Sequence, residues 1–139
     1  MKRVGIIAGA VIVVAPGAVV TLAARGTGSG DEELSVYKDP DRLLELTNDP
    51  PEDFYLVDVR TTAEYEAGHI PGALHHDYRE IAEDLPTEDR DAFVVVYCRT
   101  GNRSNSAART LERLGFTRVL DWGGIVDWPY DVVTGPDPR

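Results

Sequence analysis

The fold is decided by the stretch Phe93-Val-Val-Val-Tyr-Cys98-Arg-Thr-Gly-Asn-Arg103-Ser104. Its first five residues are strand formers in an unbroken apolar run, which predicts a buried strand of a covered parallel sheet. Residues 105–114 have helical periodicity, and Gly115 is placed to end that helix in the left-handed conformation. We therefore expect Cys98 between the carboxyl end of a strand and the amino end of a helix.

That position favours a negatively charged sulfur, because free N–H groups and the helix dipole meet there. Arg99 and Arg103 add two positive charges beside it. An ordinary cysteine has a pKa of about 8.5, and we expect the pKa of Cys98 to lie below that value. The alternative is a small buried hydrophobe, but the polar residues after Cys98 cannot be core. Cys98 is therefore the candidate nucleophile.

Other segments predict a regular alternation of helices and strands around this centre. We expect a helix from Asp39-Pro40 to Asn48, a strand at 54–59, a short helix at 62–67, a strand at 73–75, a helix at 79–85 and a strand at 117–120. Strands that alternate with helices imply a mostly parallel sheet with helices on both faces. The expected fold class is α/β.

Three segments together resemble a single-domain rhodanese, and they occur in the order expected for that family. They are Leu56-Val-Asp58-Val-Arg60 with Glu64-Tyr65 and Gly68-His-Ile-Pro-Gly-Ala73, the loop from Cys98 to Ser104, and Gly123-Gly124-Ile125 with Trp128. The resemblance implies a rhodanese-like three-layer fold, in which helices cover both faces of a mostly parallel central sheet.

The resemblance also implies a sulfurtransferase of the thiosulfate:cyanide type. Cys98 would take sulfane sulfur from thiosulfate or a persulfide donor, hold it as a persulfide, and pass it to a thiophilic acceptor such as cyanide or a thiol. These substrates are small molecules, and the reaction would need neither a cofactor nor a metal. The substrate-binding residues would directly follow the nucleophile: Arg99, Thr100, Gly101, Asn102, Arg103 and Ser104.

Each part of that loop has an expected role. Successive backbone N–H groups at a helix start form an anion nest, which would cradle the anionic intermediate. The side chains of Arg99 and Arg103 would hold the donor's sulfonate by charge-assisted hydrogen bonds. Ser104 would cap the helix.

The first segment is expected to support the site. Asp58 and Arg60 end the strand at 54–59, and ion pairing by these residues would fix the loops around the pocket. In tandem-domain members of the family an arginine near this point helps to hold the substrate. The aligned residue here is Glu64, which cannot hold an anion, so this departure argues against direct substrate contact by the first segment.

The histidines have structural interpretations. His69, in Gly-His-Ile-Pro-Gly, is expected to pack and to form hydrogen bonds around a fixed turn. His75 and His76 are adjacent, and no cysteine or carboxylate lies nearby at the spacing of metal ligands. No metal site is predicted.

Three alternative functions remain open. Rhodanese-fold phosphatases and arsenate reductases also use a cysteine, a backbone nest and an arginine, but their loops carry one residue more than the six from Cys98 through Arg103. The second alternative is an exported binding module, although many such domains have lost the cysteine. The third is a redox relay, in which any disulfide of the single cysteine would be intermolecular.

Length and charge limit the other possibilities. At 139 residues the chain has room for one domain, which we expect at residues 34–139 after a flexible linker at 27–33. The formal net charge of −10 argues against binding to the backbone of nucleic acids and against adsorption on anionic lipid.

The amino-terminal segment predicts export. Lys2 and Arg3 precede an almost unbroken apolar run at residues 4–24. Residues 1–26 fit a secretory signal peptide, and the run is also long enough to serve as an uncleaved membrane anchor. Either reading places the domain outside the cytoplasm, secreted or anchored to the outer face of the cytoplasmic membrane.

Overall fold

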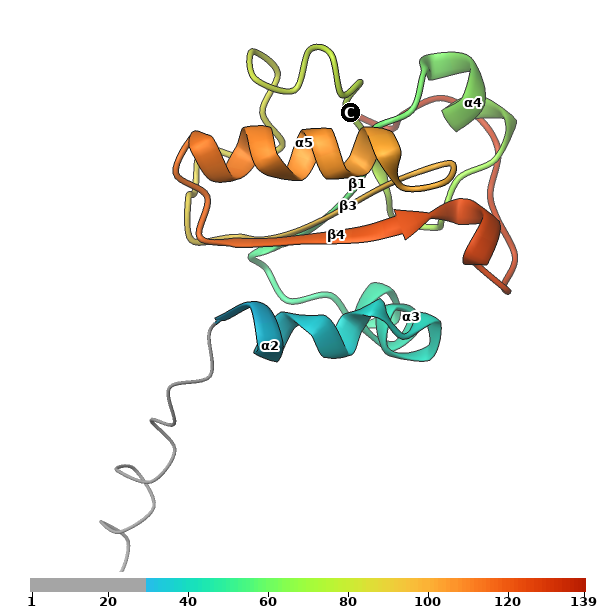
Figure 1. Ribbon diagram of the computed structural model, residues 1–139. Coiled ribbons are helices and arrows are strands. Elements are labelled where there is room, and N and C mark those ends of the chain that lie inside the picture. Colours follow the sequence, from blue (N-terminus) through green and yellow to red (C-terminus); the bar gives the residue numbers. More distant parts are fainter. Residues whose placement is uncertain (1–29) are drawn as a thin grey trace, which may run out of the picture.

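The computed structural model describes residues 30–139 and contains a four-stranded parallel sheet in the order β2-β1-β3-β4 (Figure 1). The strands are β1 (Phe54–Asp58), β2 (Leu74–His75), β3 (Phe93–Cys98) and β4 (Arg118–Gly124). The predicted signal peptide or anchor lies outside the described residues. Among residues 30–139, no helix has the length and apolarity needed to cross a membrane.

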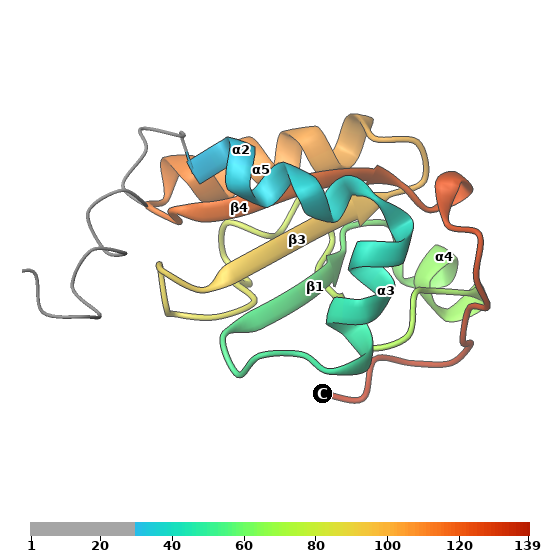
Figure 2. The ribbon, with the colours of Figure 1, turned by 90° about the horizontal axis from the view of Figure 1, so that it is seen from below.

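Helices cover both faces of this sheet. The face seen in Figure 2 carries α2 (Gly30–Ser35), the 3₁₀ turn η1 (Val36–Lys38) and α3 (Pro40–Asn48), and the opposite face carries α5 (Asn102–Arg113). The short helix α4 (Thr62–Ala67) and the 3₁₀ turn η2 (Ile125–Asp127) lie near the carboxyl ends of the strands. The predicted three-layer α/β fold is confirmed.

The core consists of two apolar clusters, one on each side of the sheet, because side chains alternate along each strand. Phe93, Val95 and Tyr97 face the layer of α2 and α3. Val94, Val96 and Cys98 face α5. All six residues of β3 are buried, so the strand that carries Cys98 is fixed from both sides.

Two predicted segments are wrong. The linker prediction fails at its end, because residues 30–33 begin helix α2, whose acidic first turn suits the helix dipole and whose Leu34 is buried in the core. Residues 79–85 form turns rather than a helix. There the N–H groups of Glu80 and Glu83 each donate to the carbonyl three residues earlier, at 2.9 Å, so the segment forms turns and no regular α-helix.

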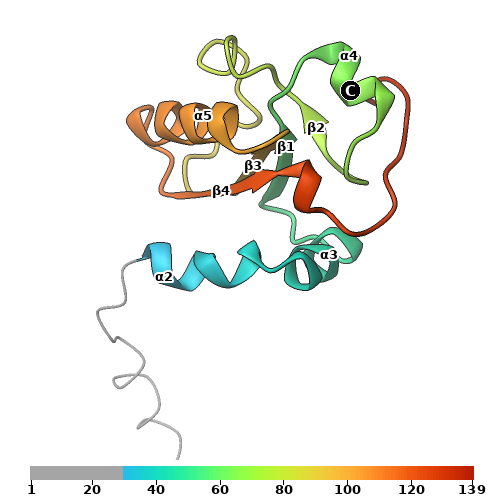
Figure 3. The ribbon, with the colours of Figure 1, turned by 45° about the vertical axis from the view of Figure 1, so that its right-hand side comes forward.

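The segment after η2, residues 130–139, runs along the β2 side of the molecule (Figure 3). Val133 forms an isolated antiparallel bridge with His69, and the N–H of Gly135 donates to the carbonyl of Glu66 at 2.9 Å. Farther on, the carboxylate of Asp137 accepts the N–H of His75 at 2.7 Å. Residues 130–139 therefore form hydrogen bonds with backbone groups near the edge strand β2 that would otherwise lack partners.

Candidate active site

Cys98 ends β3 and is almost completely buried, with 1% of its surface exposed. Helix α5 begins at Asn102, three residues earlier than predicted, so Asn102, Arg103 and Ser104 belong to its first turn. The helix is preceded by Gly101, which has a φ of 113° in the left-handed region. Glycine adopts this conformation without the steric cost of a Cβ, and it turns the chain sharply around the sulfur.

The turn brings hydrogen-bond donors onto the thiol. The N–H of Gly101 donates to Cys98 Sγ at 3.0 Å, and Ser104 Oγ lies 3.6 Å from Sγ. Burial raises the pKa of Cys98, but hydrogen bonds from Ser104, Gly101 and Thr100 outweigh it, and the pKa lies below its ordinary value. The predicted direction of the pKa shift is thus confirmed, although hydrogen bonds rather than arginine charges cause it.

Ser104 does not cap α5 as predicted, because the cap position belongs to Gly101. Its hydroxyl group is instead directed to the carbonyls of Gly101, at 3.0 Å, and Gly123, at 3.2 Å. Since Gly123 lies in β4, Ser104 ties the Cys98 loop to the neighbouring strand. The end of β4 therefore lies against the Cys98 loop.

Gly124 allows β4 to touch the loop directly. A Cβ at this position would lie 2.3 Å from the carbonyl oxygen of Arg99 and 2.7 Å from the Cα of Thr100. Those atoms are backbone and cannot move aside as a flexible side chain can. The Gly123-Gly124 pair was recognised in the sequence, but its steric role depends on strand pairing that the sequence does not reveal.

Arg103 lies in a bidentate ion pair with Glu64. The two guanidinium nitrogens reach the two carboxylate oxygens at 2.7 and 2.9 Å. The predicted role of Arg103 in holding a sulfonate stays a prediction, and it would require this pair to open. The hydrogen bond from Arg103 is the main cause that lowers the pKa of Glu64 to about 2, so Glu64 is ionised at neutral pH.

Glu64 is itself held by a capping box at the start of α4. The Thr61 side chain accepts the N–H of Glu64, and Glu64 accepts the N–H of Thr61 at 3.1 Å. The pattern Thr-x-x-Glu is visible in the sequence as a helix start. It was a signal that could have located Glu64, although not its partner 39 residues away.

Asp58 and Arg60 form the predicted ion pair, which is almost fully buried. Arg60 Nε lies 2.9 and 3.0 Å from the two carboxylate oxygens, and a terminal guanidinium nitrogen lies 2.6 Å from one of them. The same guanidinium group donates to the carbonyl of Gly68 at 2.7 Å. The pair therefore fixes the chain after α4, as expected of a supporting element.

The three histidines have partners within the fold. His69 stacks on Tyr65 and its Nδ1 lies 2.8 Å from the carbonyl of the same residue, which agrees with the predicted packing role. His75 Nε2 lies 2.7 Å from the carbonyl of Arg60, and His76 Nδ1 lies 2.9 Å from a carboxylate oxygen of Asp84.

A shallow pocket of about 410 Å³ lies beside the Cys98 loop. It is lined by Arg60, Glu64, Ala67, Gly68, Arg99, Ile125 and Val126. The chain thus brings together the loop, the first segment and the closing segment, which were separate in the sequence. The backbone of Thr100 contributes a hydrogen bond to the thiol, and Asn102 is the first residue of α5. Direct substrate contact stays a prediction for all six residues that follow Cys98: Arg99, Thr100, Gly101, Asn102, Arg103 and Ser104.

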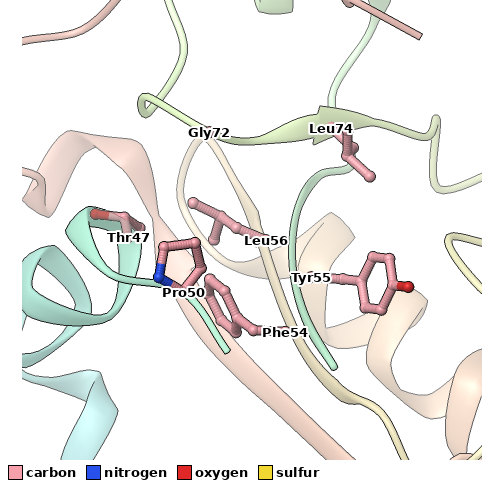
Figure 4. Close-up of a pocket in the computed structure, with 7 residues that line it drawn as sticks. All are labelled: Thr47, Pro50, Phe54, Tyr55, Leu56, Gly72 and Leu74. Atoms are coloured by element: carbon pink, nitrogen blue, oxygen red, sulfur yellow. The ribbon is translucent and has the colours of Figure 1, made fainter. Parts of the chain in front are cut away.

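A second cavity, of about 220 Å³, lies beside β1 and the β2 edge (Figure 4). Its lining residues are Thr47, Pro50, Phe54, Tyr55, Leu56, Gly72 and Leu74. None of these lining residues is a cysteine, a histidine or a carboxylate. Because the candidate nucleophile Cys98 directly precedes Arg99, the pocket that Arg99 lines is the candidate substrate site.

The family model described as a rhodanese-like domain matches residues 39–129. The chain belongs to the rhodanese-like domain family. It is 44% identical over 78 residues to a sulfurtransferase of Allochromatium vinosum, a match that covers 55% of this chain and 73% of the relative. It is 33% identical over 81 residues to the thiosulfate sulfurtransferase PspE of Escherichia coli, covering 57% of this chain and 78% of that protein.

Solved structures agree with this assignment. A structure described as a rhodanese with anions from E. coli is similar with a TM-score of 0.52 and 31% identity, over 59% of this rhodanese-like chain and 99% of that chain. The resemblance recognised in three sequence segments is thus confirmed at the level of the family and the fold.

Proposed function

We propose that the protein is a sulfurtransferase that carries sulfane sulfur as a persulfide on Cys98. The observation that carries this proposal is the geometry of the thiol, which ends a buried strand and accepts the N–H of Gly101 at 3.0 Å. Hydrogen bonds that lower its pKa favour the thiolate form. Relatives named as sulfurtransferases support the same chemistry.

The proposed first half-reaction forms one S–S bond and breaks another. The Cys98 thiolate attacks the outer sulfur of the donor, for which thiosulfate is the simplest example. The bond between the two donor sulfurs breaks, its electron pair leaves with sulfite, and the transferred sulfur remains on Cys98 as a persulfide anion. No net electron transfer to an external oxidant or reductant is needed.

In the second half-reaction a thiophilic acceptor attacks the outer sulfur of the persulfide. With cyanide the products are thiocyanate and the regenerated Cys98 thiolate, which makes the cycle ping-pong. The N–H groups around Sγ are already oriented, so they stabilise the negative charge of the persulfide without reorganisation.

Intact-mass analysis of the purified full-length protein tests the proposal. Thiosulfate should add the mass of one sulfur atom, cyanide should remove it, and Cys98→Ser should abolish the addition. The single cysteine of the chain makes the assignment unambiguous. If neither thiosulfate nor another sulfane donor adds sulfur, the mechanism fails, and hydrolysis of an aryl phosphate, reduction of arsenate or partner binding would be measured next.

We also propose that the domain is exported. Residues 1–26, with Lys2 and Arg3 before the apolar run at 4–24, support this localisation. Fractionation of cells that produce the full-length chain, followed by mass analysis of the amino terminus, distinguishes a cleaved secreted form from an anchored form. Recovery of the intact chain in the cytoplasm would contradict the proposal.

A further inference from the structure

The pocket beside Cys98 contains fewer available positive charges than its arginines suggest. The charge of Arg60 is neutralised by Asp58, at 2.6 Å. That of Arg103 is neutralised by Glu64, at 2.7 Å. Arg99 also lines the pocket, and no carboxylate within residues 30–139 pairs with its guanidinium group. One free cation therefore faces an incoming donor.

The pair between Glu64 and Arg103 is firmly held. Both guanidinium nitrogens and both carboxylate oxygens take part, and Glu64 is anchored at the same time by the N–H and hydroxyl group of Thr61. Only 27% of the Arg103 side chain and 32% of the Glu64 side chain are exposed. An anion that recruits Arg103 must therefore break two charge-assisted bonds.

Part of the pocket lining, referred to below as the apolar rim, is apolar. Ala67, Ile125 and Val126 all line it, and Val126 is 62% exposed. The N–H of Val126 donates to the carbonyl of Arg99 at 3.4 Å, so the apolar rim and the free cation are adjacent. A donor with a small apolar body can rest on this rim while its sulfur reaches Cys98.

Charge counting at the site favours a particular class of donor. The thiolate and a singly charged donor bring two negative charges, which the N–H groups around Cys98 and the free Arg99 can balance. Thiosulfate carries two charges, so with the thiolate it brings three. The third charge has no unpaired cation among the described pocket residues, because Glu64 has withdrawn Arg103.

We propose that Glu64 is a specificity-determining residue, which sets the site for monoanionic sulfane donors with an apolar body, namely organic thiosulfonates and persulfides, over thiosulfate. This inference rests on the proposed sulfur transfer. With a thiosulfonate, the Cys98 thiolate attacks the outer sulfur, the bond between the two sulfurs breaks, and a sulfinate leaves with the electron pair. With an organic persulfide, a thiolate leaves instead.

The decisive variant is Glu64→Gln, which removes the charge but keeps a side chain that can complete the capping box. The measurement is kcat/KM for sulfur loading of full-length protein by three donors: thiosulfate, methanethiosulfonate and benzenethiosulfonate. Release of Arg103 should raise kcat/KM for thiosulfate by roughly fivefold to tenfold, as expected when Arg103 forms one additional ion pair of modest strength with this donor. The values for the two monoanions should change by less than about twofold, because their charge is already balanced.

Two further variants test the cause. In an Arg103→Gln background, Glu64→Gln should give no gain with thiosulfate, because the cation to be released is absent. Val126→Ser should lower the preference for benzenethiosulfonate over methanethiosulfonate by roughly twofold to fivefold, through loss of apolar contact. Asp53→Asn, which removes an ion pair with Arg118 at the amino ends of the strands, controls for the loss of a surface pair and should leave all three donor ratios unchanged.

Equal changes for all three donors in Glu64→Gln would overturn the inference, and so would a thiosulfate gain that persists without Arg103. If no donor loads sulfur onto Cys98 in the unmodified protein, the proposed function fails. The two failures are therefore distinguishable in one set of measurements.

Discussion

The buried pair of Asp58 and Arg60 should dominate the stability of the chain around the pocket. Arg60→Met removes the guanidinium group but keeps an unbranched side chain of similar reach. It leaves the carboxylate of Asp58, which has 0% of its surface exposed, without its three side-chain contacts at 2.6 to 3.0 Å. An uncompensated buried charge costs about 3–5 kcal/mol.

Urea unfolding followed by tryptophan fluorescence measures this cost, because Trp122 and Trp128 are both buried. We expect the free energy of unfolding of Arg60→Met to fall by about 4 kcal/mol. The double variant Asp58→Asn with Arg60→Met should recover about 2 kcal/mol of this loss, since it removes the stranded charge.

The control is Asp53→Asn, which breaks a pair whose side chains are 45% and 46% exposed. Loss of such a surface pair should cost no more than about 1 kcal/mol. Two results would refute the reasoning: a cost for Arg60→Met as small as that of the control, or a double variant less stable than Arg60→Met alone.

Three further predictions concern the site. Ser104→Ala should raise the pKa of Cys98, because the hydroxyl group lies 3.6 Å from Sγ and can turn from its carbonyl partners to donate to the thiolate, which lowers the pKa. The ultraviolet absorbance of the thiolate against pH checks this, and an unchanged curve contradicts it. The pKa of Glu64 is lowered from 4.5 to about 2, so its stabilising contribution is complete above pH 4.5 and is lost as the pH falls through about 2. Urea unfolding should show that the unmodified protein loses more stability across this window than Glu64→Gln does, whereas parallel losses would argue against the pair. Gly124→Ala should destabilise the fold and slow sulfur loading, since its Cβ would meet loop backbone at 2.3 Å, while Gly30→Ala, with nothing within 4 Å, should affect neither.

Local sequence patterns were sufficient for the elements that depend on local chemistry. The apolar run of β3, the Asp39-Pro40 start of α3 and the short helix α4 all occur where they were predicted. Each has a strong local cause: an uninterrupted buried strand, a side-chain cap followed by proline, or a capping box. The position of Cys98 at a strand end follows from the same pattern.

Predictions of structure failed where the outcome depends on particular contacts that the spacing of apolar residues does not reveal. Residues 79–85 have the composition of a helix, but the N–H groups of Glu80 and Glu83 bond to carbonyls three residues earlier and form turns instead. The left-handed Gly101 starts α5 earlier than the apolar pattern of residues 105–114 indicates. The partner of Arg103 is in another helix, and only the assembled sheet brings it close.

The order of the strands means that the active site is completed late in folding. Strand β3 lies between β1 and β4 and is parallel to both, so no hairpin can form either pairing early. Because Ser104 reaches Gly123 only after β4 has joined β3, one of the bonds that tie the loop in place is missing until that step. The surroundings of Cys98 are therefore complete only after the last strand has docked, and a change in the acidity of its thiol is expected to accompany that step.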